Sequence, residues 1–216
     1  MGDEPVSVIG EGLTLDGFLG IPRDTDGVVL FAHGSGSGRF SPRNGLVAHR
    51  LQRGRIATLL IDLLNEAEAE DPRNVFDIHL LAERVLLAAA WLKKDHRTQR
   101  LPLGYFGAST GAGAALQAAA SVPELVAAVV SRGGRPDLAE AYLPRVTAPT
   151  LLLVGGYDRP VIEMNEAAFR LLRAPKELIV IPGATHLFEE PNTLEQVADH
   201  ALEWFRRHLV ASAGHH

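Results

Sequence analysis

A serine between two glycines stands where a buried strand gives way to a helix. The motif GASTG, residues 107–111, follows the apolar run PLGYF and leads directly into TGAGAALQAAA. Flanking glycines allow the tight, strained turn that exposes a serine hydroxyl at the end of a strand. The amides at the start of the following helix favour negative charge there. This context predicts Ser109 as a nucleophile for acyl transfer. The alternative is a glycine-rich turn with an incidental serine.

A serine hydroxyl is a weak nucleophile unless a base takes its proton. Asp158 follows the strand-like TLLLV, and His186 follows ELIVI. Both therefore lie beyond the carboxyl ends of strands, where open α/β sheets place their ligands. Either residue alone is often structural, but the order Ser, Asp, His is a known triad order. We expect His186 to be the base and Asp158 to orient it. Glu189 and Glu190 are weaker candidates for the acid.

The glycine-rich loop HGSGSG, residues 33–38, follows the apolar run VVLFA. An acyl-transfer site needs backbone N–H groups aimed at the developing oxyanion. We expect these donors to be the amides of Ser35 and Thr110, the latter directly after the nucleophile. The alternative is a phosphate-binding loop, but Arg39 stands where a dinucleotide fingerprint has its third glycine. His33 is expected to hold the loop by hydrogen bonding.

Two arginines, Arg132 and Arg135, follow the next apolar run, AAVVS. At this edge their guanidinium groups could bind a carboxylate or phosphate of the substrate. The alternative is that they form salt bridges or close a loop. Only residues 132–149 separate this run from the next one, which leaves room for a short helix but not for a cap domain. An open site with small or short-chain ester substrates is expected.

Short apolar runs alternate with longer helical patterns along most of the chain. Runs of this kind are typical of parallel strands that are covered on both faces. Alternating strands and helices predict a mostly parallel sheet with helices on both faces. The expected strands are 28–32, 56–61, 102–106, 127–131, 150–154 and 177–181, and the expected helices are 42–52, 74–94, 110–121, 160–172 and 193–209.

The N-terminal segments 6–9 and 14–19 have no helix between them and predict an antiparallel hairpin at the sheet edge. The acidic stretch 66–71 is interpreted as a solvated loop. No proline- or serine-rich linker divides the chain, so residues 1–210 are expected to form a single domain. Residues 211–216 resemble a tail that begins a purification tag, and His215 and His216 are left out of any site.

The segments AHGSGSG, GYFGASTGAG, VGGYD and PGATHLFEEP together resemble the dienelactone-hydrolase-like branch of the α/β-hydrolases. The resemblance covers nearly the whole chain, and it implies an α/β-hydrolase fold and a serine hydrolase. Some similar bacterial proteins are fused to a phosphoribosyltransferase domain, for which we expect no room here. Dienelactone hydrolases proper use a cysteine nucleophile, whereas this chain has Ser109. This difference favours simple ester hydrolysis, with lactones as a possible extension.

Charge and composition exclude several classes of binding function and of metal or disulfide site. The net charge of −5 provides no basic field for nucleic acid or an anionic membrane. The chain has no cysteine, so disulfides and thiolate zinc sites are excluded. The histidines show no metal-ligand spacing. We expect no metal, no cofactor and a small-molecule ester as partner, and, without a signal-peptide pattern, a cytoplasmic protein. The rival class is a non-catalytic ligand-binding protein on the same fold.

Overall fold

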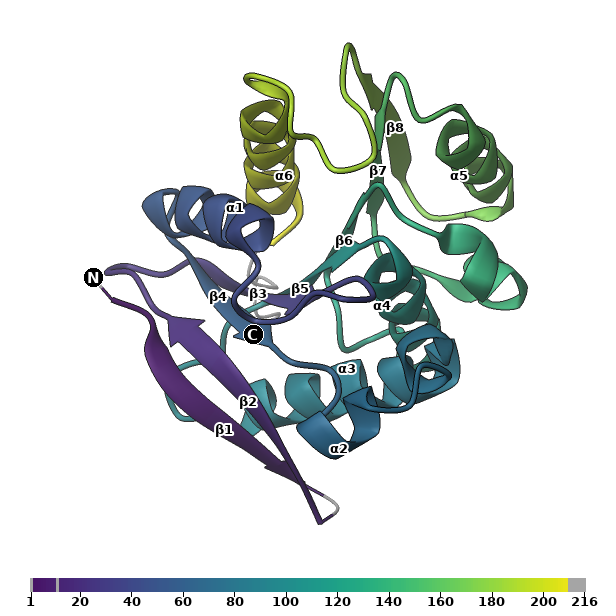
Figure 1. Ribbon diagram of the computed structural model, residues 1–216. Coiled ribbons are helices and arrows are strands. Elements are labelled where there is room, and N and C mark those ends of the chain that lie inside the picture. The colour runs from purple at the N-terminus through teal and green to yellow at the C-terminus, as the bar shows by residue number, and fades with distance from the viewer. Residues whose placement is uncertain (1, 11, 210–216) are drawn as a thin grey trace.

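An eight-stranded sheet forms the centre of the computed structural model, which describes residues 2–10 and 12–209 (Figure 1). The strand order is β1-β2-β4-β3-β5-β6-β7-β8. From β4 to β8 all neighbouring strands are parallel. The strands are β1 Glu4–Gly10, β2 Leu13–Gly20, β3 Gly27–Ala32, β4 Ile56–Ile61, β5 Leu103–Ala108, β6 Ala128–Arg132, β7 Thr150–Gly155 and β8 Lys176–Ile181.

The N-terminal hairpin extends this sheet, as the sequence predicts. β1 pairs with β2, and β2 pairs with β4, in both cases antiparallel. The alternation of exposed and buried residues along β1 and β2 contrasts with the complete burial of β3, β4 and β5. This contrast is expected between an edge hairpin and central parallel strands.

Helices cover both faces of the sheet. The helices α1 (Pro42–Arg53) and α6 (Thr193–His208) pack on one face, side by side. On the other face lie α3 (Ile78–Lys94), α4 (Thr110–Ser121) and α5 (Arg159–Leu171). Each face has its own buried apolar cluster. Together with the hairpin, this arrangement confirms the predicted fold class. In residues 2–10 and 12–209, no helix has the length and apolarity to cross a membrane.

The segment between β4 and α3 differs from the prediction. The acidic stretch contains a short helix, α2 (Glu66–Ala69), because the Asn65 side chain and Glu68 form a capping box at its start. The predicted helix from residue 74 divides into a 3₁₀ turn, η1 (Asn74–Phe76), and α3. Asp77 separates them, since its carboxylate accepts a hydrogen bond from the Leu80 amide and so caps α3.

Between β6 and β7 the chain forms the kinked 3₁₀ segment η2 (Pro136–Arg145). Apart from η2 and the last residue of β6, the described residues 132–149 contain no helix or strand. This short crossover agrees with the expected lack of a cap domain. The predicted tail, residues 211–216, lies outside the described residues.

Candidate active site

Ser109 lies at the sharp turn between β5 and α4. Its backbone has φ 51° and ψ −122°, a conformation that is strained for a residue with a side chain. Two backbone hydrogen bonds fix this turn: the Ser109 amide donates to the Arg132 carbonyl at 3.2 Å, and the Arg135 amide donates to the Ser109 carbonyl at 3.0 Å. Ser109 is half-buried. The fold therefore presents one serine hydroxyl at the carboxyl edge of the sheet.

The flanking glycines are required by close backbone contacts. A Cβ at Gly107 would lie 2.4 Å from the Ala112 Cα, and a Cβ at Gly111 would lie 2.2 Å from the Ala32 carbonyl oxygen. Gly34 lies directly against Ser109, because a Cβ there would lie 3.0 Å from the Ser109 Cβ. These contacts pack the start of α4 against the end of β3 and bring the glycine-rich loop to Ser109.

The structure brings together two of the predicted site residues, Asp158 and His186. The Asp158 Oδ2 lies 2.6 Å from the His186 Nδ1, the distance of a strong charge-assisted hydrogen bond. The Asp158 side chain is 14% exposed and that of His186 is 40% exposed, so the carboxylate is shielded while the imidazole faces the site. Glu190 instead accepts hydrogen bonds from the backbone and hydroxyl of Thr185, and Glu189 lies near Arg43.

The segment after β6 lies next to both the His186 imidazole and the Ser109 turn. A Cβ at Gly133 would lie 3.6 Å from the His186 Cε1, and the preceding carbonyl, that of Arg132, holds the Ser109 amide. Within the described chain no hydrogen bond joins the Ser109 Oγ to His186. Catalytic hydrogen bonds are often long before a substrate binds.

The two predicted oxyanion donors lie next to each other. The Ser35 amide donates to the Thr110 Oγ1 at 3.0 Å. This bond places the glycine-rich loop against the residue that follows Ser109, and it occupies the Ser35 amide. The sequence does not predict the Thr110 hydroxyl as the acceptor.

His33 holds the glycine-rich loop, as predicted. Its Nδ1 donates to the Gly34 carbonyl at 2.9 Å, and its Nε2 accepts from the Leu63 amide at 2.9 Å. Burial lowers the pKa of His33, so the ring is neutral near pH 7. Both ring nitrogens have backbone partners, which leaves neither for proton transfer.

The two predicted substrate-binding arginines, Arg132 and Arg135, differ in their burial and in their hydrogen-bond partners. Arg135 forms a two-fold hydrogen bond with the Asp137 carboxylate at 2.9 and 2.8 Å, so its guanidinium is engaged. Arg132 is only 8% exposed, and its Nη1 has no hydrogen-bond partner among the described residues. Burial and the neighbouring charge of Arg43 lower the pKa of Arg132 to about 10, which leaves it protonated at pH 7. The neighbouring Arg43 was missed in the sequence.

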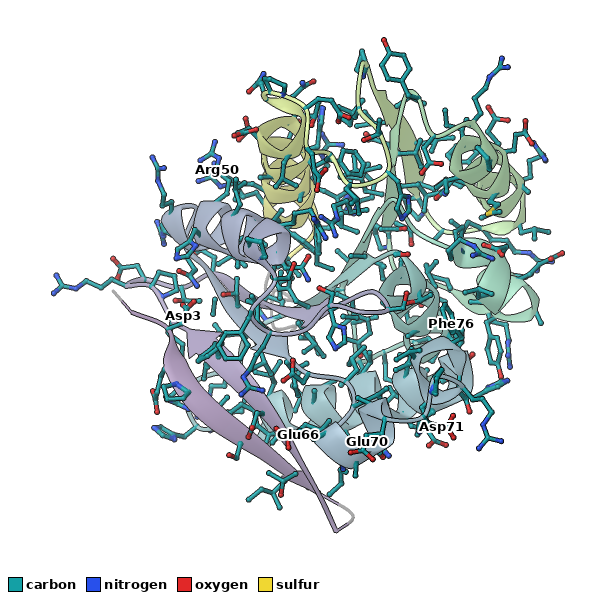
Figure 2. The ribbon with its side chains drawn as sticks, viewed as in Figure 1. Asp3, Arg50, Glu66, Glu70, Asp71 and Phe76 are labelled. Atoms are coloured by element: carbon teal, nitrogen blue, oxygen red, sulfur yellow. The ribbon has the colours of Figure 1, made fainter. Side chains whose placement is uncertain are left out.

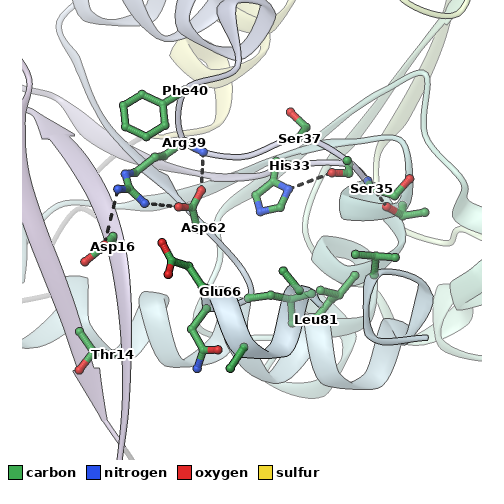
Figure 3. Close-up of a pocket in the computed structure, with 18 residues that line it drawn as sticks. Thr14, Asp16, His33, Ser35, Ser37, Arg39, Phe40, Asp62, Glu66 and Leu81 are labelled. Atoms are coloured by element: carbon green, nitrogen blue, oxygen red, sulfur yellow. Dashed lines mark hydrogen bonds and ion pairs between the residues drawn. The ribbon is translucent and has the colours of Figure 1, made fainter. Parts of the chain in front are cut away.

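A cavity of about 740 Å³ opens next to the Ser109 turn, with Gly34, Ser35 and Thr110 in its lining (Figure 3). Gly34, Ser35 and Thr110 form one end of its lining, and Asp16, Arg39, Asp62 and Glu66 belong to the rest. The volume is within the range of small-molecule sites. The sequence does not predict these charged residues as site residues, although Asp62, directly after β4, stands where a site residue is expected. No group of three or more histidine, aspartate or glutamate side chains suited to a metal was found in the described chain.

The chain is similar to known hydrolases over nearly its whole length. Residues 65–209 match the dienelactone hydrolase family. A dienelactone hydrolase from Anabaena variabilis is 58% identical, with a TM-score of 0.93 over 96% of this chain and 98% of that one. The chain belongs to the dienelactone hydrolase family. The family and the fold indicate a hydrolase.

More distant structures share the fold of this dienelactone hydrolase family member. Est1E from Butyrivibrio proteoclasticus is 17% identical, with a TM-score of 0.82 over 96% of this chain and 98% of that one. Two Mycobacterium tuberculosis proteins, whose names propose a phosphoribosyl transferase, are 54% identical over 207 residues, which is 96% of this chain. The chain spans 47% of their length, so it matches about half of each.

Proposed function

We propose that this member of the dienelactone hydrolase family is a serine hydrolase of carboxylic esters. The observation that carries the proposal is the 2.6 Å contact between Asp158 and His186 at the same sheet edge as the strained Ser109 turn. An imidazole oriented by a shielded carboxylate, at the same sheet edge as a half-buried serine, is the arrangement that acyl transfer needs. The phosphoribosyl transferase name describes proteins about twice as long and is not transferred to this chain.

In the proposed reaction the Ser109 Oγ attacks the ester carbonyl carbon while the His186 Nε2 takes the hydroxyl proton. Asp158 accepts a hydrogen bond from His186 Nδ1–H and stabilises the imidazolium that forms. The protonated His186 then gives this proton to the departing alkoxide, which leaves as an alcohol. Water attacks the acyl-serine, His186 takes a proton from that water, and the same proton returns to Ser109 as the acid departs.

The oxyanion of each tetrahedral intermediate needs two N–H donors. We assign this role to the amides of Ser35 and Thr110. Because the Ser35 amide donates to the Thr110 hydroxyl at 3.0 Å, the oxyanion replaces that hydroxyl as the acceptor. The exchange replaces a neutral acceptor with a charged one, and hydrogen bonds to charged acceptors are stronger.

Arg132 gives the site a preference for esters whose leaving group carries a negative charge. It ends β6, which lies between β5 with Ser109 and β7, whose following loop carries Asp158. A buried guanidinium nitrogen without a partner is costly unless a ligand or water satisfies it. We assign Arg132 to an anionic group on the alcohol part of the substrate. We do not assign this role to Arg135, because its guanidinium is paired with Asp137.

The test is turnover of p-nitrophenyl acetate and butyrate by the purified chain. A serine hydrolase shows saturable release of nitrophenol that Ser109→Ala abolishes without loss of the thermal unfolding transition. A ligand-binding protein without catalysis binds the esters but releases no more nitrophenol than the Ser109→Ala variant does. That second result would refute the proposal.

A further inference from the structure

The cavity beside the nucleophile and the histidine lie on opposite sides of Ser109. The strand order places β2, β4 and β3 on one side of β5, and β6, β7 and β8 on the other. The cavity lining comes from the first side: Asp16 is on β2, Asp62 follows β4 and Ser35 follows β3. Asp158 and His186 follow β7 and β8. Ser109 therefore lies between the cavity and His186, the proposed base.

This separation determines which part of an ester enters the cavity. The departing alcohol must lie within reach of His186, because that residue supplies its proton. The acyl group then extends away from His186, past Ser35 and Thr110 and into the cavity. This step rests on the proposed function. A volume of about 740 Å³ also exceeds what an acetyl or butyryl group needs, so the expected preference for short acyl chains is not a limit of space.

The far end of the cavity is acidic. Figure 3 shows Asp16, Asp62 and Glu66 gathered away from Ser35. Arg39 neutralises part of this negative charge, since its guanidinium contacts the Asp62 carboxylate and lies 3.5 Å from the Asp16 Oδ2. Three carboxylates thus line this end of the cavity, and the guanidinium of Arg39 contacts two of them. In the described chain Glu66 makes no ion pair, and its side chain is exposed to the cavity.

Arg39 itself is held and cannot turn to a ligand at little cost. It stacks over the Phe40 ring at 4.6 Å and lies 5.7 Å from that of Phe18, and its amide donates to the Asp62 Oδ1 at 2.6 Å. Cation–π contact and ion pairing together fix the guanidinium. The excess charge at this end of the cavity is therefore negative.

The geometry points to an acyl site in this cavity that selects a positively charged or uncharged acyl end over a negatively charged one. Asp16 and Glu66 are the residues that determine this selection. Adjacent strands are about 4.8 Å apart, so Asp62, two strands from β5, lies roughly 10 Å from the nucleophile's strand. Acyl chains long enough to cover that distance meet the acidic end, whereas acetyl does not.

The experiment compares p-nitrophenyl esters of equal acyl length that end in trimethylammonium, tert-butyl or carboxylate. The first two ends have the same shape, so their kcat/KM ratio isolates charge. We expect trimethylammonium to exceed tert-butyl, and tert-butyl to exceed carboxylate. Each charge removed by Asp16→Asn or Glu66→Gln should reduce the trimethylammonium preference roughly three- to tenfold at low salt. Added salt should reduce the preference in the unmodified protein.

Glu70→Gln is the matched control, because Glu70 is exposed at the end of the same short helix as Glu66 and does not line the cavity (Figure 2). It should leave the preference unchanged. Turnover of the acetate ester by the same preparations tests the proposed function separately. If acetate is hydrolysed while the three long esters react equally, or not at all, the inference is refuted alone. If acetate is not hydrolysed, the proposed function fails and this inference fails with it.

Discussion

Ser109 shows how a single residue is set by its neighbours. Its positive φ is unfavourable for a side-chain-bearing residue and persists only because the surrounding structure enforces it. The hydrogen bonds to the Arg132 carbonyl and from the Arg135 amide provide that enforcement. The turn places Ser109 beyond the strand end, next to Gly34 of the glycine-rich loop and at the same sheet edge as the loop that carries His186.

Asp158 is expected to matter through the orientation of His186. An asparagine keeps the shape but offers the imidazole a different hydrogen-bond pattern, which favours the wrong tautomer. Asp158→Asn should lower kcat by roughly 10⁴-fold, the loss known for the same change in a serine-protease triad. The control is Glu189→Gln, whose carboxylate is 65% exposed and lies near Arg43. Steady-state kinetics on an acetate ester check both variants. If the two effects were exchanged, Asp158 would not be the acid.

Arg132 and Arg135 should respond differently to removal of charge. A charge-assisted hydrogen bond contributes about 1.5–3 kcal/mol, so Arg132→Gln should cost roughly 10- to 150-fold in kcat/KM for an ester with an anionic alcohol part. A neutral ester of the same size should be almost unaffected. Arg135→Gln, which loses its pair with Asp137, should affect both esters equally. Equal losses in Arg132→Gln on both esters would assign Arg132 a structural role.

For single residues, the sequence predicts which side chains lie at the site better than it predicts their hydrogen-bond partners. The positions of Ser109, Asp158 and His186 follow from which residue comes after which strand. The pairing of Arg135 with Asp137 and the acceptor of the Ser35 amide do not, since both depend on side-chain directions in loops. Arg43 and Glu66 are not predicted as site residues, because Arg43 lies within a helix and the acidic stretch that begins at Glu66 is typical of a solvated loop.

The element that makes the site is the junction of β5 with α4. Ala32 and His33 at the end of β3 crowd its first helical turn, so residue 111 can only be glycine. The predicted strand and helix match this junction closely because an apolar strand, a glycine-flanked serine and an alanine-rich helix are three consecutive local signals. The segment before α3 was predicted less well, since there the boundaries depend on side-chain caps by Asn65 and Asp77.

Gly111→Ala tests the junction directly. The added Cβ would lie 2.2 Å from the Ala32 carbonyl oxygen and 2.4 Å from that of His33, so strand β3 or helix α4 must shift. Overpacking of this kind costs about 1–3 kcal/mol. We expect a lower free energy of unfolding in urea and a large loss of ester turnover.

Gly45→Ala is the control for that change, because a Cβ at this position in α1 meets no atom within 4 Å. Alanine is favoured over glycine inside a helix by roughly 0.5–1 kcal/mol, so this variant should be slightly more stable and fully active. Equal stability and activity of Gly111→Ala and the unmodified protein would show that the turn does not need its glycine.

At the scale of the whole molecule, the sheet divides the site into two halves that meet at Ser109. Asp158 and His186 follow β7 and β8, and the cavity is built largely on β2, β4 and β3. The sequence predicts the parallel sheet and its hairpin, because strand and helix patterns alternate regularly. It does not reveal the cavity, whose lining combines residues of β2, of the loops after β3 and β4, and of the start of α4.

The central claim is that Ser109 is a nucleophile activated by His186 and Asp158. The most direct measurement is reaction of the native chain with a fluorophosphonate, followed by mass spectrometry of its peptides. We expect one adduct per chain, on Ser109, that forms together with the loss of ester turnover. We expect no adduct in Ser109→Ala and slow labelling in Asp158→Asn. An adduct on another residue, or labelling of Ser109→Ala at the rate of the native chain, would contradict the assignment of Ser109 as the nucleophile.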